Sequence, residues 1–312
     1  MMTRAIVFPG QGSQAVGMGC ELADACPAAR EVFDVVDEAL GQKLSRLMFE
    51  GPDDELILTE NAQPALLTHS IAALCALKSE GFDLEVEAAF VAGHSLGEYT
   101  AFVAAGTLSL ADAAILVRTR GRAMQQAVPV GDGAMAVLLG LEVADAEAVA
   151  AEASKGEVCD FANDNALGQV VISGDASAVE RAVEIAKKRG AKRAMLLPVS
   201  APFHCALMAP AADIMVDALA AVEMKDPAVP VIANVTAALV ADAAEARERL
   251  VEQVTGRVRW RESVVYMRDR GVEDIVEVGT GKVLAGLARR IDRDLSAVSI
   301  GGPAGIKEFL GG

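Results

Sequence analysis

The chain has 312 residues, of which 53% are hydrophobic, and a formal charge of −16 at pH 7. Its mean hydropathy is positive, so it can bury a sizeable core as one large domain or two smaller ones. The negative charge argues against a surface that binds nucleic acid or an anionic membrane. No apolar stretch approaches the roughly 20 residues that span a bilayer, so we expect no transmembrane helix.

The amino terminus and the cysteines bear on location and on metal binding. Only three consecutive large apolar residues precede Pro9-Gly10, so the apolar core of a signal peptide is missing and we expect a cytoplasmic protein. The five cysteines form no Cys-x-x-Cys pair, and the chain has three histidines. We therefore expect neither a disulfide scaffold nor a Cys/His zinc site.

The first hundred residues alternate between strand and helix patterns. Strands are predicted at 4–8 and 88–92, and helices at 28–40, 64–80 and 96–105. The second strand stops at Gly93, and a helix follows after a short turn. Strand, tight turn and helix in this order are typical of an α/β fold.

Between residues 128 and 198 the pattern changes to β-α-β-β-α-β, which is the ferredoxin-like order. The predicted elements are 134–139, 143–154, 158–162, 169–173, 176–189 and 194–199. Glycines and prolines flank the segment, as expected where a chain leaves and re-enters a larger domain. We therefore predict an α/β-hydrolase-like subdomain of residues 1–127 and 199–312, with a ferredoxin-like subdomain of residues 128–198 inserted into it.

The α/β pattern resumes after the insertion. Helices are predicted at 208–222, 243–254 and 281–291, and strands at 229–234 and 274–278. Two glycine-rich segments, Gly10-Gln-Gly12 and Gly279-Thr-Gly281-Lys282, are similar to nucleotide-binding loops, but neither completes such a motif. We therefore expect no nucleotide site.

The segment Gly93-His94-Ser95-Leu96-Gly97 matches G-x-S-x-G between a predicted strand and a predicted helix. Such a turn holds the serine hydroxyl outward, while the next amide and the helix amino terminus point toward a developing oxyanion. The two glycines leave room for the turn to pack. The alternative is a structural serine that only caps the helix.

A serine nucleophile needs a general base, and each histidine is a candidate. His94 follows a strand and adjoins Ser95, so alternation along the strand predicts that it faces away from the cleft. His69 lies among leucines of the predicted helix 64–80, where we expect a packed structural role. His204 lies in a proline-containing loop after the insertion, which makes it the candidate base of a Ser-His dyad oriented by a main-chain carbonyl. The alternative for His204 is a structural loop histidine.

Arg118, Arg120 and Arg122 follow the nucleophile on one predicted helix. Residues two apart on a helix do not share a face, so Arg120 projects away from its two neighbours. An arginine of this helix is either a solvated surface charge or, if it enters the cleft, a bidentate partner for a substrate carboxylate.

Seven separated motifs occur in order over nearly the whole chain. They are Phe8-Pro-Gly-Gln11-Gly-Ser-Gln, Gln63-Pro-Ala, Gly93-His-Ser95-Leu-Gly-Glu, Arg120 in its helix, Asn163-x-Asn165 with Gly168-Gln169, Pro202-Phe-His204, and Glu277-Val-Gly-Thr-Gly-Lys282. Together they resemble the malonyl-CoA:acyl-carrier-protein transacylases and the acyltransferase domains of fatty-acid and polyketide synthases. The inserted subdomain also stands where that family has a ferredoxin-like one.

The resemblance implies transfer of a malonyl group from malonyl-CoA to an acyl carrier protein, as in fatty-acid biosynthesis, without a metal, nucleotide or redox cofactor. Ser95 would carry the malonyl group as an ester, and His204 would act as the general base. The amides of Gln11 and Leu96 would form the oxyanion hole. Arg120 would bind the free malonate carboxylate.

The resemblance also assigns residues around the substrate. Gln63 would act as a positioning residue, and Asn163 would support the cleft from the inserted subdomain. Phe203 stands where some relatives have Ser, and its ring would crowd a methyl branch, which implies a preference for malonyl over methylmalonyl groups. Single-chain relatives often carry Gln before Trp260, whose main-chain carbonyl would orient the catalytic histidine; in this chain Arg259 would supply that carbonyl.

The implied partners are a coenzyme A thioester and an acyl carrier protein, and we expect a monomer. Carrier proteins are acidic, so docking needs a basic surface on this acidic chain. The candidate surface is a basic cluster, consisting of Lys187, Lys188, Arg189, Lys192 and Arg193. These residues alternatively only complement the dipole at a helix carboxyl end. Two other functions remain open, a serine esterase or thioesterase and a non-catalytic docking module.

Overall fold

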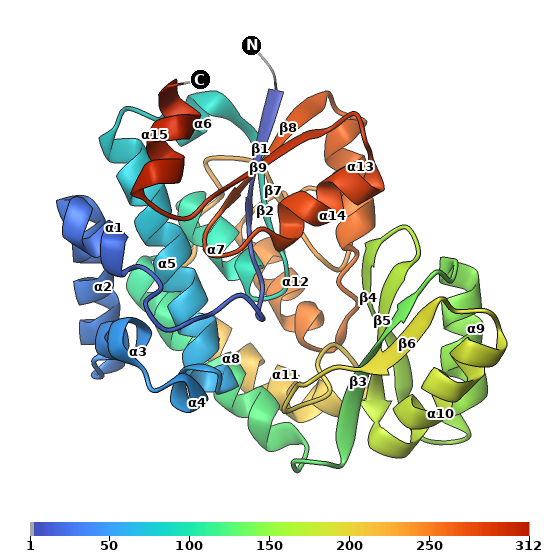
Figure 1. The fold of residues 1–312 in the computed structure, drawn as a ribbon. Helices are drawn as coiled ribbons and strands as arrows, with labels where there is room; N and C mark the ends of the chain where they lie inside the picture. Colours follow the sequence, from blue (N-terminus) through green and yellow to red (C-terminus); the bar gives the residue numbers. More distant parts are fainter. Residues whose placement is uncertain (1–2, 312) are drawn as a thin grey trace.

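Two sheets organise residues 3–311, which are the residues that this computed structural model describes (Figure 1). The larger sheet is parallel and has the strand order β7-β2-β1-β8-β9. Its strands are β1 (Thr3–Phe8), β2 (Ala88–Gly93), β7 (Val231–Ile232), β8 (Val272–Val278) and β9 (Ser296–Ile300). The predicted α/β fold class is confirmed.

Helices cover both faces of the parallel sheet, so its strands are apolar on both sides. Along β1, Ala5 and Val7 pack toward one face, and Ile6 and Phe8 pack toward the other. The first face is covered by α13 (Trp260–Arg268) and α14 (Val283–Ile291), and the second by α5 (Thr59–Ser79) and α7 (Gly97–Ala104).

The remaining helices of the large subdomain surround these layers. They are α1 (Cys20–Ala25), α2 (Pro27–Leu40), α3 (Leu44–Glu50), α4 (Asp53–Leu56), α6 (Leu84–Glu87), α8 (Leu110–Ala127), η1 (Ala206–Met208), α11 (Ala209–Ala220), α12 (Ala243–Thr255) and α15 (Pro303–Gly311). Within residues 3–311, no helix combines the length and the apolar character that a membrane crossing requires.

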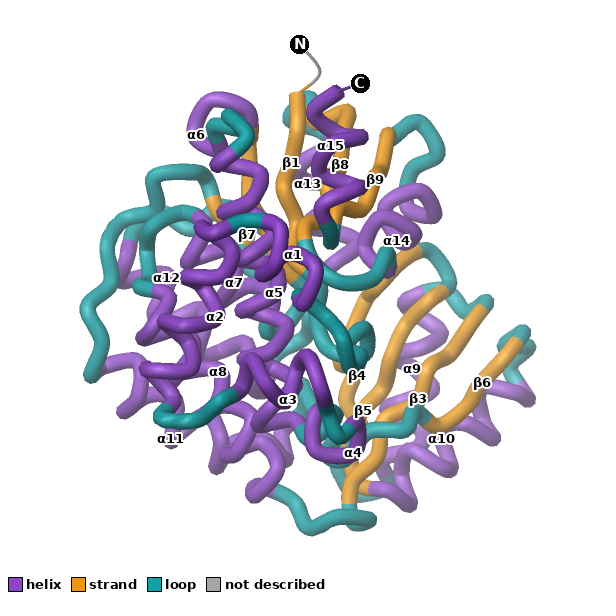
Figure 2. The backbone as a smooth tube through the Cα atoms, turned by 60° about the vertical axis from the view of Figure 1, so that its left-hand side comes forward, coloured by secondary structure: helices purple, strands orange, loops and turns teal. Residues whose placement is uncertain are grey.

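The smaller sheet is antiparallel, with the order β4-β5-β3-β6, and lies beside the large subdomain (Figure 2). Its elements are β3 (Gly133–Leu139), α9 (Val143–Ser154), β4 (Cys159–Ala166), β5 (Gln169–Asp175), α10 (Ala176–Lys188) and β6 (Arg193–Leu196). This is the predicted ferredoxin-like order. Both helices pack on one face of the sheet, while Met135 and Val171 on the other face join the core of the large subdomain.

The junction between the subdomains is built on β4 and the loop before α13. The amide of Asp164 donates to the carbonyl of Val258 at 2.9 Å, and the buried Asp164 carboxylate pairs with Arg261 at 2.7 Å. The guanidinium of Arg257 lies 3.9 Å from the centre of the Phe161 ring. These contacts hold the open face of the small sheet toward the parallel sheet.

Several predicted boundaries were wrong, among them that of the strand predicted at 194–199, which ends at Leu196. The helix predicted at 64–80 begins at Thr59 and contains Pro64; proline is typical of a first turn, which misplaced the start. The strand predicted at 229–234 is only Val231–Ile232, because it is an edge strand that pairs with β2 on one side. The strand predicted at 158–162 extends to Ala166. The elements that were not predicted are α1, α3, α4, α6, η1, α13, β9 and α15.

Gly97 lies where α7 meets the end of β1. A Cβ atom at this position would lie 2.3 Å from the main-chain oxygen of Phe8 and 2.9 Å from that of Pro9. Because main-chain atoms cannot move aside without moving the sheet, Gly97→Ala should lower the free energy of unfolding by about 3 kcal/mol. Gly286→Ala is the control, since Gly286 is exposed on α14 with no atom within 4 Å of its Cβ position.

The control variant should raise the free energy of unfolding by about 0.5–1 kcal/mol, because alanine is the better helix former. Urea unfolding followed by the fluorescence of the single tryptophan, Trp260, measures both changes. Equal effects of the two substitutions would contradict the close approach at Gly97.

Candidate active site

Ser95 stands in the turn between β2 and α7 with a φ of 53°. A positive φ is rare for a residue other than glycine and rotates the side chain out of the strand's alternation. Asn234 holds this turn, because its Oδ1 accepts from the Ser95 amide at 2.7 Å and its Nδ2 donates to the Gly93 carbonyl at 2.6 Å. The hydroxyl thereby lines a cleft of about 620 Å³ at the carboxyl end of the parallel sheet.

His204 lies directly against the serine. Its Nε2 is 2.8 Å from Ser95 Oγ, and its Nδ1 is 2.9 Å from the main-chain oxygen of Gln253. Because the carbonyl can only accept, Nδ1 carries the proton and Nε2 offers its lone pair to the hydroxyl. His204 is 4% exposed and, like Ser95, has a positive φ, of 59°. The predicted Ser-His pair therefore has the geometry of a nucleophile and a general base.

The expectation that Arg259 supplies the carbonyl for His204 is wrong. The residue is Gln253, in the last turn of α12, where main-chain carbonyls have no partner within the helix. The carbonyl of Arg259 is at the start of α13 and already accepts from the Ser263 amide at 2.9 Å.

Burial determines the protonation of the histidine. Burial, with a smaller contribution from the charge of Arg120, lowers the pKa of His204 to about 3. The imidazole is therefore neutral at physiological pH and can accept the serine proton.

Arg120 brings a buried positive charge to the same hydroxyl. Its Nη2 lies 3.1 Å from Ser95 Oγ and 2.7 Å from Gln253 Oε1, and its Nη1 lies 2.8 Å from Gln63 Oε1. The residue is 2% exposed. Within residues 3–311 it has no carboxylate within salt-bridge distance, so its charge is held by neutral amide oxygens.

The neighbouring arginines of α8 face elsewhere, as predicted from helix geometry. Arg122 is exposed and pairs with Glu60 at 2.5 Å. Arg118 donates to Gln42 and, at 3.4 Å, to Asn61. Only Arg120 of the three lines the cleft.

The other residues implied by the resemblance also line this cleft, namely Gln11, Gln63, Leu96, Asn163 and Phe203. In the described part of the chain, the main-chain amides of Gln11 and Leu96 donate to no protein acceptor, so both can receive an oxyanion. The Gln11 side chain donates to Thr59 Oγ1 at 3.3 Å. Phe203 is nearly buried, and its ring forms part of the apolar wall.

The histidine next to the nucleophile was placed incorrectly. His94 lines the cleft, with its Nε2 2.8 Å from Asn165 Oδ1, whereas strand alternation predicted that it faces away. Alternation fails here because the positive φ of Ser95 ends the extended backbone. The prediction for His69 is confirmed, since it is buried in α5 and does not line this cleft.

The sequence analysis gave no role to three residues that contact the cleft residues, namely Glu98, Asn234 and Gln253. Glu98 Oε2 accepts from Gln253 Nε2 at 2.7 Å and from the Asn234 amide at 3.2 Å. Asn234 had a usable signal, because it ends a predicted strand, where parallel sheets place their site residues. Gln253 had none, since it is one polar residue among several on α12.

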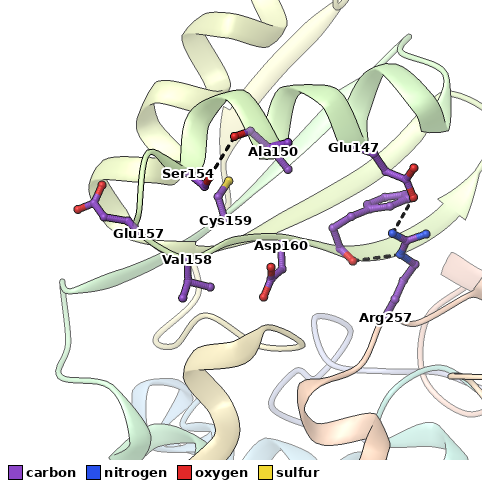
Figure 3. A pocket seen from close by; sticks show the side chains of 10 residues that line it. Glu147, Ala150, Ser154, Glu157, Val158, Cys159, Asp160 and Arg257 are labelled. Carbon is purple, nitrogen blue, oxygen red and sulfur yellow. Dashed lines mark hydrogen bonds and ion pairs between the residues drawn. The ribbon is translucent and has the colours of Figure 1, made fainter.

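A second depression, of about 490 Å³, lies between α9, β4 and the loop of Arg257 (Figure 3). Its acidic groups already have partners, because Asp160 accepts a main-chain amide at 2.8 Å and Glu157 pairs with Arg181 at 2.5 Å. Burial raises the pKa of the Cys159 thiol in its wall to about 11, so the thiol stays protonated. Among the described residues, no histidine lines this depression, so it lacks a Ser-His pair like that of the Ser95 cleft. Across the same residues, no group of three or more His, Cys, Asp or Glu side chains is arranged to hold a metal ion.

Comparison with known proteins shows which family this chain is similar to. The family model described as "Acyl transferase domain" matches residues 5–294. The malonyl CoA-acyl carrier protein transacylase of Bacillus subtilis is 49% identical over 307 residues, covering 97% of this chain and 95% of its own. The crystal structure of an acyl-carrier-protein S-malonyltransferase from Bartonella henselae superposes with a TM-score of 0.97 at 53% identity, covering 99% and 98% of the two chains.

A third relative was solved with a partner. It is a malonyl-transacylase in complex with its type II PKS acyl-carrier protein, with a TM-score of 0.94 at 42% identity and 97% coverage of each chain. Such agreement over the whole length extends to both subdomains.

The lowered pKa of His204 predicts how stability depends on pH. Between pH 6.5 and about 3, His204 is protonated in the unfolded chain but neutral in the folded one. The contribution of this residue to stability is therefore lost as pH falls below 6.5. The stability advantage of the wild type over His204→Gln should therefore shrink by about 2 kcal/mol between pH 7 and pH 5. Urea unfolding at the two pH values measures this difference, and parallel curves would contradict a neutral buried imidazole.

Proposed function

This chain belongs to the acyltransferase family that includes the malonyl-CoA:acyl carrier protein transacylases, and on that premise we propose that it moves malonyl groups from coenzyme A to a carrier-protein thiol. The observation that carries the proposal is that Ser95 Oγ lies 2.8 Å from His204 Nε2 and 3.1 Å from Arg120 Nη2. A nucleophile, its base and an unpaired guanidinium suit an acyl group that bears its own carboxylate.

In the first half of the proposed ping-pong cycle, His204 Nε2 takes the proton of Ser95 as Oγ attacks the thioester carbonyl carbon. The negative charge that develops on the carbonyl oxygen is stabilised by the amides of Gln11 and Leu96. The carbon–sulfur bond then breaks, the proton passes from His204 to the thiolate, and coenzyme A leaves a malonyl ester on Ser95.

In the second half, the phosphopantetheine thiol of the carrier protein gives its proton to His204 and attacks the ester carbonyl. The carbon–oxygen bond breaks, and Ser95 Oγ recovers the proton from the imidazole. Every step balances with side chains and main-chain amides of this chain, so the cycle requires no metal or redox cofactor.

Recognition of the malonyl group is assigned to Arg120. In the free protein Nη2 donates to Ser95 Oγ, and a bound carboxylate would take over this donor together with a second one. Gln63 holds the guanidinium from one side, and Asn163 closes the cleft from the small sheet. The Phe203 ring favours malonyl over methylmalonyl groups, because one methyl group in a packed wall changes binding by about 1–3 kcal/mol.

A serine esterase or thioesterase is the competing function, with water in place of the carrier thiol. The buried Arg120 argues against a general esterase, because a substrate without a carboxylate gains nothing from an unpaired guanidinium.

Intact-protein mass spectrometry after brief incubation with malonyl-CoA tests the transfer. The wild type should gain one malonyl group, Ser95→Ala should gain none, and holo carrier protein should discharge the adduct. Ser200→Ala is the matched control. Ser200 lines the same cleft, but its hydroxyl contacts Thr59 and not His204. An adduct that is lost to water at the same rate without carrier protein would favour the hydrolase.

We place carrier-protein docking on the basic cluster and on β6, which leads from it to the cleft. Two members of the cluster have ion-pair partners, since Lys187 contacts Glu184 at 2.7 Å and Arg189 contacts Glu152 at 2.5 Å. Within the described residues the other three, Lys188, Lys192 and Arg193, form no ion pair. Edge strand β6 then exposes Met195 and Leu196, and the chain continues into the cleft wall at Leu197.

Charge reversal of Lys188 and Lys192 to Glu should raise the KM for carrier protein about tenfold and leave the KM for malonyl-CoA unchanged, because surface charges chiefly steer the partner. The control is the same reversal at two exposed lysines outside the cluster, Lys225 and Lys307, which matches the change in net charge. Equal kinetics of the two double variants would leave the cluster only its role at the carboxyl end of α10.

A further inference from the structure

We propose that Glu98 is a positioning residue for acyl transfer, because its carboxylate sets the orientation of the Gln253 side chain and, through it, the position of Arg120. The inference rests on the proposed function of Ser95, Arg120 and His204. Glu98 does not line the cleft, so it acts through its neighbours and not on the substrate.

Glu98 is the second residue of α7 and is fully buried. Its Oε2 accepts from Gln253 Nε2 at 2.7 Å and from the Asn234 amide at 3.2 Å. Its Oε1 has no partner among the described residues. A buried carboxylate with an unsatisfied oxygen is costly, which indicates that the site gains something from this group other than stability.

What the site gains is a defined orientation of the Gln253 side-chain amide. An ionised carboxylate only accepts hydrogen bonds, so Gln253 must turn its NH2 group toward Glu98. Its Oε1 then faces Arg120, whose guanidinium only donates, at 2.7 Å. With the amide reversed, NH2 would face the guanidinium and oxygen would face the carboxylate, and both contacts would be repulsive. Glu98, as the charged acceptor of the Gln253 NH2 group, thereby strengthens the one orientation of Gln253 that holds Arg120 Nη2 beside the nucleophile.

The same carboxylate supports both members of the proposed dyad. Gln253 Nε2 also donates to the main-chain oxygen of Ser95 at 2.9 Å, and its own carbonyl accepts from His204 Nδ1. Asn234, whose amide donates to Glu98, holds the Ser95 amide through its side chain. Nucleophile, base and guanidinium are therefore all within two hydrogen bonds of one buried carboxylate.

The orientation argument requires the ionised form of Glu98. Burial raises its pKa to about 7, while hydrogen bonds from Gln253 and Asn234 and the charge of Arg120 on α8 act in the opposite direction. Within residues 3–311, Tyr99 on α7 is a further titratable group that is coupled to Glu98 by charge, and burial raises its pKa. Below pH 7 the protonated carboxyl binds the Gln253 NH2 group less strongly, so the orientation of the amide then depends on its contacts with Arg120 and the Ser95 carbonyl alone, and Arg120 is held less firmly.

A measurement on the wild type needs no variant. We compare single-turnover acylation by malonyl-CoA with acylation by acetyl-CoA, which lacks the carboxylate, from pH 5.5 to pH 8.5. Effects on attack by Ser95 cancel in the ratio of the two rates. The preference for malonyl should fall about tenfold toward pH 5.5, because the loss of one charge-assisted hydrogen bond changes the rate ratio by about this factor. A preference that does not change with pH would overturn the proposal.

Glu98→Gln is the corresponding variant, and it should show the reduced preference at every pH, with no change near pH 7. Glu277→Gln is the matched control, because Glu277 is also fully buried, has one oxygen without a partner among the described residues, and has a raised pKa, but bonds only to the Ala285 amide and Ser299. The control should keep the wild-type preference and its pH dependence. A purely structural role of Glu98 would instead slow both thioesters equally and leave the ratio unchanged.

Urea unfolding of the two variants at pH 5 and pH 8 tests whether they are folded. Both carboxyls have folded pKa values raised above those of the unfolded chain, so each costs the wild type stability as pH rises from 4.5 through the folded pKa. Both Gln variants should therefore gain stability relative to the wild type between pH 5 and pH 8. A folded Glu98→Gln protein with wild-type preference would overturn this inference alone, whereas a wild type that is never acylated at Ser95 would overturn the proposed function.

Discussion

The close approach of the β2–α7 turn to the end of β1 is the constraint on which the site depends. Glycine at position 97 lets the helix start directly against the main-chain oxygens of Phe8 and Pro9. Because the turn is so tight, Ser95 takes a positive φ and leaves the plane of the sheet. The same contact brings the segment after β1 beside Leu96, so Gln11 and Leu96, whose amides have no acceptor within residues 3–311, line one cleft. A larger residue at 97 would separate them.

The inserted subdomain contributes an open sheet face. Its helices cover only one side of the antiparallel sheet, and the other side, with Met135, Asn163 and Val171, forms a wall of the cleft. Paired main-chain bonds between β4 and the loop at Val258 hold that wall in register with the parallel sheet. A cleft between two rigid sheets can exclude water from an ester and still admit a long thiol arm, which is what the proposed transfer requires.

The sequence predicted those site residues whose role is set locally. Glycine spacing marks the turn of Ser95, and helix geometry separates Arg120 from Arg118 and Arg122. Gln253 was not predictable in this way, because its carbonyl acts only where the end of α12 meets His204, which lies 49 positions away in the chain. The orientation of His94 was predicted wrongly, since alternation applies to extended backbone and Ser95 is not extended.

The position of Gln253 between Arg120 and Glu98 explains how a buried cation remains available to a substrate. A direct ion pair between the two residues would satisfy the guanidinium, and a malonate carboxylate would then have to displace a bound carboxylate. The neutral amide instead accepts from Arg120 and donates to Glu98. The amide links the Glu98 carboxylate to the Arg120 guanidinium and orients both side chains, while each of them keeps its charge. The guanidinium consequently keeps donors that an incoming carboxylate can satisfy, which is what the proposed recognition of a malonyl group by Arg120 requires.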